Sequence, residues 1–236
     1  MSPTGPQPPA DGHPRAEEPI LITPSMLTAP AQRVPVDFER GMSLVPAFTL
    51  LLIVVNVAVF AWELSIGALA DASSIVAAGA LVRDRVVAGE FWRAATAMFL
   101  HGGLDHLIGN VIVLYIVGMA CEHAFGAART AFVYFAAGLS GAALSLFMRP
   151  GPSVGASGAI FGVLASVVVV LHRYRDRFHL RDKRIAYVLA AWAGYQVLSG
   201  LATPFIDNFA HLGGIAGGTL ATFMVEPRLL RQESPL

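Results

Sequence analysis

Residues 44–66 read LVPAFTLLLIVVNVAVFAWELSI, an apolar run with a single charged side chain, Glu63. A helix rises about 1.5 Å per residue, so about 20 apolar residues cross a hydrocarbon layer about 30 Å thick. No water is available in that layer, and every backbone amide needs a hydrogen bond within its own segment, which favours a helix. This run therefore predicts a transmembrane helix.

Five more apolar runs follow, and we expect helices at 106–122, 130–148, 157–172, 184–203 and 208–225. The runs at 106–122 and 157–172 are short, which predicts that these helices begin below the membrane surface or cross a thinned bilayer. No alternation typical of strands competes with the helical interpretation. The predicted fold class is an all-α, polytopic membrane protein with a bundle of six transmembrane helices.

The composition supports a membrane protein. Hydrophobic residues make up 55% of the 236 residues and charged residues only 14%, against about 25% in a typical soluble domain. The mean hydropathy of +0.62 argues against both a soluble globular chain and a disordered one. Sixteen basic and sixteen acidic residues give no net charge, so we expect no nucleic-acid partner. Cys121 is the only cysteine, which excludes a disulfide within the chain.

The composition also divides the chain into three parts. Ten of the fifteen prolines fall within the first 46 positions, so we expect residues 1–43 to form a flexible cytoplasmic tail. Residues 44–225 would form the six-helix domain, and residues 226–236 a C-terminal tail. The connection at about 67–105 is unusually long, so we expect it to be functional or partly structured and to lie on the membrane interface.

The distribution of basic residues predicts the orientation. Six of the sixteen lie in the connection between 172 and 184: Arg173, Arg175, Arg177, Arg181, Lys183 and Arg184. Placing this connection in the cytoplasm puts both tails and the predicted 123–129 turn there too, with twelve of the sixteen basic residues. The bias predicts an even number of spans, two cytoplasmic termini and an external 67–105 loop.

Four polar side chains stand near the starts of the second, fourth and sixth predicted helices: His106, Asn110, Ser157 and His211. Polar groups at membrane depth are costly, and they therefore indicate a function. These three helices would run in the same direction, so their first turns should lie at a similar depth near the outer surface.

Glycines could bring two of these helices together. Gly158 and Gly162 are four residues apart, and so are the members of two further pairs, Gly213/Gly217 and Gly214/Gly218. This spacing lets helix backbones approach closely in lipid, although it also serves ordinary helix packing.

Ser157 and His211 suit nucleophilic catalysis if they are adjacent. A neutral imidazole can take the proton of a serine hydroxyl, which is otherwise a weak nucleophile. Free N–H groups at a helix start at Ser157 could stabilise an oxyanion, and His106 and Asn110, one turn apart, could both donate to it. Each residue alone could equally be a polar group hydrogen-bonded in the core.

The same polar residues are compatible with other kinds of site. His101, Asp105 and His106 could bind a metal, but their spacing lacks the HExxH pattern, so we expect none. Asp207, one turn before His211, is either a third catalytic residue or, as we favour, a residue that starts a helix. A small transporter would need a polar path across the membrane, whereas these polar groups gather at one depth.

The core resembles the rhomboid family of intramembrane serine proteases over about residues 44–225. Trp92–Arg93 is similar to the Trp–Arg pair of the family's first external loop. Three further motifs match in order: His106-xxx-Asn110, Gly155-x-Ser157-Gly158 and Ala210-His211-x-Gly213-Gly214.

The resemblance implies a serine endopeptidase that cleaves transmembrane protein substrates near the extracytoplasmic side through an acyl-enzyme, without a cofactor. Ser157 would be the nucleophile and His211 the general base, in a dyad with no required carboxylate. His106, Asn110 and the Ser157 N–H would form the oxyanion hole. Gly155, Gly158 and Phe161 would support the site. Phe161 matches an aromatic position that packs against the catalytic histidine. Glu122 matches a structural acidic position of the family.

The resemblance also implies the six-span bacterial form, an integral protein of the plasma membrane. Substrate would enter through a lateral opening beside 184–203, where Trp192 and Tyr195 lie. The rival hypothesis is a non-catalytic rhomboid-like protein that binds membrane clients; such relatives usually lack the nucleophile or the base, and both are present here.

Overall fold

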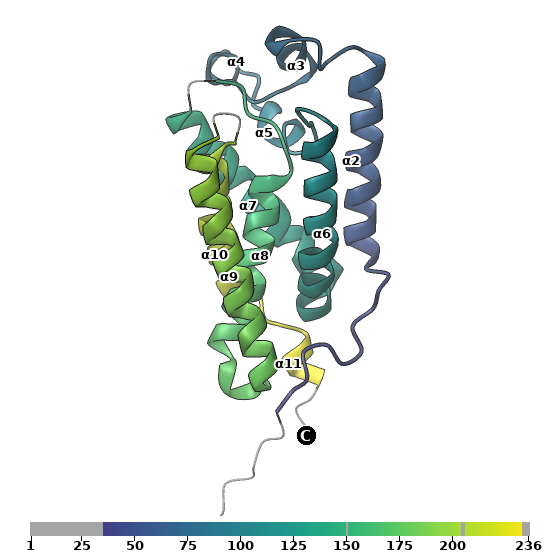
Figure 1. The fold of residues 1–236 in the computed structure, drawn as a ribbon, viewed down its shortest axis with the longest axis vertical. Coiled ribbons are helices and arrows are strands. Elements are labelled where there is room, and N and C mark those ends of the chain that lie inside the picture. Colours follow the sequence, from purple (N-terminus) through teal and green to yellow (C-terminus); the bar gives the residue numbers. More distant parts are fainter. Residues whose placement is uncertain (1–34, 150, 204–205, 233–236) are drawn as a thin grey trace, which may run out of the picture. The chain divides into compact units, whose positions relative to one another are not determined.

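The computed structural model describes residues 35–149, 151–203 and 206–232. Helices of 17 to 22 residues dominate this part of the chain (Figure 1). They are α2 (Ala47–Ser65), α6 (Leu104–Phe125), α7 (Ala127–Met148), α8 (Ser157–Arg173), α9 (Leu180–Leu201) and α10 (Asn208–Met224). The described residues contain two isolated β-bridges but no strand, which confirms the all-α prediction for them. Most of the predicted 1–43 tail lies outside the described residues.

Three helices of the described chain, α2, α6 and α7, are long and apolar enough to cross a membrane. α8 is also apolar but has only 17 residues, which agrees with the short helix expected at 157–172. The short helix expected at 106–122 was wrong, because α6 extends over 22 residues, from Leu104 to Phe125. These helices fit a membrane protein, while the count of six crossings stays a prediction.

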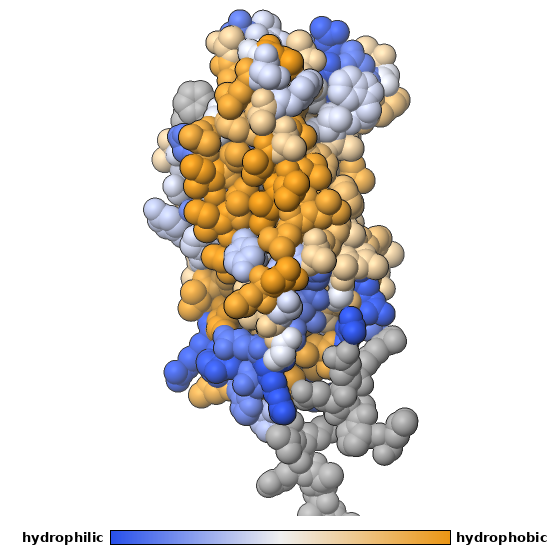
Figure 2. Space-filling view, turned by 90° about the vertical axis from the view of Figure 1, so that its right-hand side faces the viewer, coloured by the Kyte–Doolittle hydropathy of each residue, from blue (hydrophilic) through white to orange (hydrophobic). Residues whose placement is uncertain are grey.

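Apolar side chains face outward from the helices. Ile108, Ile112 and Ile116, spaced four residues apart on α6, are 49%, 55% and 52% exposed. Figure 2 shows hydrophobic side chains gathered between two more hydrophilic ends on one face of the molecule. Such a continuous apolar surface is unfavourable in water but matches the hydrocarbon layer of a bilayer.

Two helix boundaries differ from the sequence expectation. α7 follows α6 after Gly126 alone, where we expected a turn over 123–129. Gly126 has a φ of +80°, which glycine adopts without a Cβ penalty, so the chain reverses within one residue. α9 begins at Leu180 instead of 184, and its first turn carries charged residues with good helix propensity that a search for apolar runs does not detect.

The backbones of α8 and α10 are in direct contact. A Cβ at Gly214 would clash with the carbonyl oxygen of Gly158, and a Cβ at Gly218 would clash with the backbone of Gly162. Only glycine allows this approach, which brings the two helices together along two turns. Ser166 of α8 extends the contact, because its Oγ lies 2.6 Å from Thr222 Oγ1 of α10.

The other glycine pair of α10 faces a different helix. A Cβ at Gly213 would lie 2.7 Å from the carbonyl oxygen of Ser140, and one at Gly217 would clash with the Ser140 side chain, both on α7. α10 therefore uses its two glycine faces against two helices, and is held between α7 and α8.

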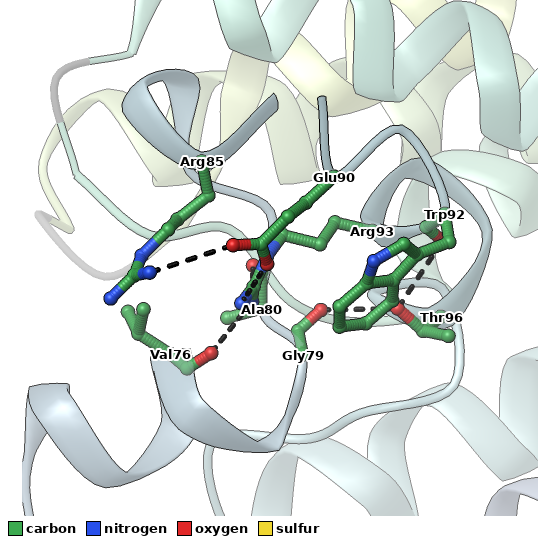
Figure 3. A network of polar contacts seen from close by, with 8 residues as sticks. All are labelled: Val76, Gly79, Ala80, Arg85, Glu90, Trp92, Arg93 and Thr96. Atoms are coloured by element: carbon green, nitrogen blue, oxygen red, sulfur yellow. Dashed lines mark hydrogen bonds and ion pairs between the residues drawn. The ribbon is translucent and has the colours of Figure 1, made fainter. Parts of the chain in front are cut away.

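Three short helices structure the connection between α2 and α6: α3 (Ala72–Ala78), α4 (Arg83–Val87) and α5 (Arg93–Thr96). Arg93 is only 4% exposed. It donates to the carbonyl oxygens of Val76 at 2.6 Å and Ala80 at 2.9 Å, and to Glu90 Oε2 at 2.6 Å (Figure 3). Its guanidinium also lies 4.6 Å from the Trp92 ring centroid. The Trp92–Arg93 pair thus ties the end of α3 to the start of α5.

We expect Gly214→Ala to destabilise the fold by at least about 1–3 kcal/mol, because the added methyl group forces α8 and α10 apart. Gly194→Ala is the matched control, since a Cβ at this exposed position of α9 meets nothing within 4 Å. The control should be neutral or more stable by up to about 1 kcal/mol. Thermal unfolding in detergent measures both, and equal melting temperatures would contradict the close contact.

Candidate active site

Ser157 is the first residue of α8, and the loop before it is anchored to the connection that follows α2. Ser153 and Leu81 exchange two backbone hydrogen bonds of 3.0 Å each, and the Gly155 N–H donates to the carbonyl of Ala97 at 2.8 Å. Gly155 has a φ of +123°, a conformation that strains residues with a Cβ. These contacts fix where α8 begins and thereby fix the position of Ser157 along the helix bundle.

His211 lies in the first turn of α10 and is 7% exposed. Its Nε2 is 3.0 Å from Ser157 Oγ, a hydrogen-bond distance. The glycine contact between α8 and α10 begins within a few residues of both side chains, at Gly158 and Gly214. The packing of α8 against α10 therefore brings the His211 imidazole next to the Ser157 hydroxyl.

Aromatic stacking orients the imidazole. The ring of Phe161, one turn after Ser157, stacks on His211 with centroids 4.2 Å apart and an interplanar angle of 13°. Trp192 of α9 also stacks on Phe161, with centroids 6.0 Å apart and an interplanar angle of 24°. The His211 Nδ1 atom is buried and has no hydrogen-bond partner in the described residues, so packing sets the ring plane.

Asp207 contacts the helix start and not the ring of His211. Its Oδ1 accepts a hydrogen bond from the Ala210 N–H at 3.0 Å, which is an N-cap of α10. Its Oδ2 accepts from Ser145 Oγ of α7 at 2.5 Å. This is the role of a helix-start residue that we favoured over a third catalytic residue.

His106 and Asn110 of α6 both reach the loop before Ser157. A Cβ at Gly155 would lie 2.9 Å from His106 Nε2 and 3.6 Å from Asn110 Nδ2. Because Gly155 has no side chain, the His106 ring and the Asn110 amide can occupy the space beside it. Asn110 Nδ2 is a buried donor without a partner in the described residues, which leaves it free for a bound group.

The backbone before α6 selects the tautomer of His106. The Gly102 N–H donates to His106 Nδ1 at 3.4 Å, so a neutral His106 carries its proton on Nε2, the nitrogen nearer Gly155. The turn that presents Gly102 is held from α2: both carboxylate oxygens of Glu63 accept from the His101 N–H, at 3.0 and 3.1 Å. Glu63 is completely buried.

Sequence reasoning did not assign Glu63 a role. The signal was present, because Glu63 is the one charged residue of an otherwise apolar run, and a charge at membrane depth is retained for a reason. Its partner could not be read from the sequence, since His101 lies 38 residues further along the chain.

The described residues contain no group of three or more His, Cys, Asp or Glu side chains that could hold a metal ion. The His101 ring packs edge-on against His106, with centroids 5.3 Å apart. Burial, and next the neighbouring His106, lower the pKa of His101 to about 4, so it is neutral near pH 7.

Comparison with known proteins gives one family. The family model described as the Rhomboid domain matches residues 88–228, which include the four polar residues described above. Rhomboid protease GluP of Bacillus subtilis (strain 168) is 36% identical over 186 residues, covering 78% of this chain and 35% of its own. Rhomboid protease AarA of Providencia stuartii is 28% identical over 212 residues, covering 78% of this chain and 75% of its own.

A third relative carries a different name. Inactive RHOMBOID-like protein 8 of Arabidopsis thaliana is 34% identical over 126 residues, covering 53% of this chain and 35% of its own. The chain thus spans just over a third of GluP and of this plant protein, and three quarters of AarA.

Proposed function

The chain belongs to the rhomboid family, and from this premise we propose that it is a serine endopeptidase that cleaves transmembrane segments of protein substrates. Family membership and the apolar helices together make it an integral membrane protein. The observation that carries the proposal is the 3.0 Å hydrogen bond between Ser157 Oγ and His211 Nε2. A serine hydroxyl in contact with an imidazole is the arrangement that activates a serine nucleophile.

In the first step, Ser157 Oγ attacks the carbonyl carbon of the scissile peptide bond while His211 Nε2 takes the hydroxyl proton. The carbonyl oxygen becomes an oxyanion. The Ser157 N–H supports it, because the first N–H groups of a helix have no partner within the helix. His106 Nε2–H and Asn110 Nδ2 supply two further donors from α6.

In the second step, the C–N bond breaks, and His211 returns the proton to the leaving amine nitrogen. The substrate's N-terminal part remains as an ester on Ser157. Water then attacks this ester with His211 again acting as base, which releases the new carboxyl group and restores the serine hydroxyl. No carboxylate is required, in keeping with the absence of a contact between Asp207 and the His211 ring among the described hydrogen bonds.

The proposed arrangement in the membrane has six crossings, formed by α2, α6, α7, α8, α9 and α10. The bridge between Val36 and Phe178 supports an even number of crossings between these two residues, because it joins the chain before α2 to the turn after α8. The Arg and Lys bias supports a cytoplasmic location of this end, with Ser157 near the extracytoplasmic side. The proposed membrane is the bacterial plasma membrane. α9 buries few residues, namely Asp182, Ala186, Ala193 and Gly200, which fits a helix beside which substrate enters.

We expect Ser157→Ala and His211→Ala each to lower cleavage of a model transmembrane substrate at least about a thousandfold, because each removes one half of the proton transfer. The measurement is turnover by purified protein in detergent or liposomes. Ser166→Ala is the matched control, since it removes a hydroxyl from the same helix at a contact with Thr222 and should leave cleavage intact.

Labelling by a fluorophosphonate separates the protease from the client-binding alternative. The wild-type protein should be labelled at Ser157, and neither Ser157→Ala nor His211→Ala should be. A folded wild-type protein that captures transmembrane clients but takes no label would refute the protease and favour the alternative.

We expect cleavage to slow as the pH falls, because His211 accepts the serine proton only when it is neutral. An ordinary histidine has a pKa of about 6.5, so protonation removes the base on the acid side of the titration, and activity returns as the pH rises. The measurement is kcat/KM against pH. A rate that shows no decrease on the acid side at any pH at which the protein stays folded would count against His211 as the base.

We expect Glu63→Ala to lower kcat about tenfold or more, since loss of the acceptor frees the turn that sets the His106 tautomer. Glu63→Gln keeps one carbonyl oxygen for the His101 N–H and should retain most activity. KM should change little in both variants, because the oxyanion hole acts in the transition state. A wild-type kcat in Glu63→Ala would show that Glu63 has no positioning role.

A further inference from the structure

A cavity lies at the end of α6 that is remote from Ser157. Its volume is about 1130 Å³, large enough for a small-molecule ligand or a lipid headgroup. Its walls come from the segment before α2, the last turn of α6, the first residue of α7 and the chain just before α11 (Leu229–Gln232). None of the residues proposed for catalysis lines it.

The acidic residues in this cavity are already engaged. Asp37 Oδ1 forms an ion pair of 2.6 Å with Arg181. Glu122 accepts three hydrogen bonds from the start of α2: from the N–H groups of Phe48 and Thr49 at 3.1 and 3.0 Å, and from Thr49 Oγ1 at 2.9 Å. Asp37 therefore has a cationic partner, and the Glu122 oxygens are occupied by the hydrogen bonds that cap α2.

The basic residues are not engaged. Arg40 and Arg228 line the cavity, and neither guanidinium has an ion-pair or hydrogen-bond partner among the described residues. Arg228 Nη1 lies against the α6–α7 turn, 3.7 Å from the position that a Cβ at Gly126 would take. His123 and His179 complete the polar wall. The cavity thus presents two free guanidinium groups, which bind phosphate oxygens well.

The cavity opens at the boundary of the apolar surface. Pro46 and Ala47, where α2 begins, belong to its wall, and so does Val45. Val45 and the adjacent Leu44 are 70% and 71% exposed. A phospholipid has the same layout, with acyl chains in the apolar layer and a phosphate at its edge, within reach of basic side chains.

We propose that this cavity binds the phosphate group of an anionic phospholipid, held by Arg40 and Arg228, with the acyl chains against the apolar residues at the start of α2. A phosphate anion is the shared chemistry, and inorganic phosphate is the competing source. The proposal does not rest on the proposed protease function, because it involves neither Ser157 nor His211.

The test uses the purified, delipidated full chain in a neutral detergent. Phosphatidylglycerol, phosphatidylcholine or inorganic phosphate is titrated in, and the melting temperature is followed. Phosphatidylglycerol should raise the melting temperature, and the other two should not, because a ligand that binds the folded state stabilises it. Equal shifts with the two lipids, or a full shift with inorganic phosphate alone, would overturn the proposal.

The variant Arg40→Gln/Arg228→Gln should bind phosphatidylglycerol about tenfold or more weakly, since two charge-assisted contacts are lost. Its matched control is Arg175→Gln/Lys183→Gln, which removes the same charge at the same end of the bundle but outside the cavity lining. The control should keep the full shift. Equal loss in both variants would indicate unspecific attraction to the lipid surface and refute the site.

A second measurement covers the case in which the double variant does not fold. Native mass spectrometry of the wild-type protein should retain phosphatidylglycerol adducts under conditions that strip phosphatidylcholine. Equal retention of the two lipids would overturn the proposal. Cleavage by wild-type protein reports on the protease separately, so the two proposals can fail independently.

Discussion

The close contact between α8 and α10 is the constraint on which the candidate site depends. Gly158 and Gly162 meet Gly214 and Gly218 at distances that no other residue permits. In lipid, where water gives no hydrophobic drive, such backbone approach and the polar contacts beside it hold helices together. The same contact sets the spacing of the two helix starts, and with it the 3.0 Å between Ser157 and His211.

Some polar residues of the described chain stabilise helix ends, and others are available for the proposed reaction. Glu122 caps α2, Asp207 caps α10, and Arg93 ties the short helices of the connection after α2. These groups find partners inside the protein, as a membrane interior requires. Asn110 Nδ2, in contrast, is a buried donor without a partner in the described residues, beside the loop of Ser157.

The two ends of α6 carry different chemistry. At its start, the Gly102 N–H donates to His106, and Glu63 of α2 holds the preceding residue, so α2 positions a residue of the proposed oxyanion hole without contacting it. At its end, Glu122 accepts hydrogen bonds from the start of α2, and Arg228 lies beside Gly126 without an ion-pair partner among the described residues. α2 thus contributes to both ends, although it supplies none of the proposed catalytic groups.

The helices and the candidate residues could be predicted from the chain alone, because apolar length and polar residues at membrane depth are local properties. The helix predicted at 157–172 is close to the observed Ser157–Arg173, and Ser157 and His211 were candidates before the fold was known. The helix faces that meet became visible only in the folded chain. Gly213 and Gly217 pack on α7, and Glu63 reaches a backbone amide 38 residues away. Spacing along one helix cannot reveal its partner, since partner choice depends on how all the helices pack together.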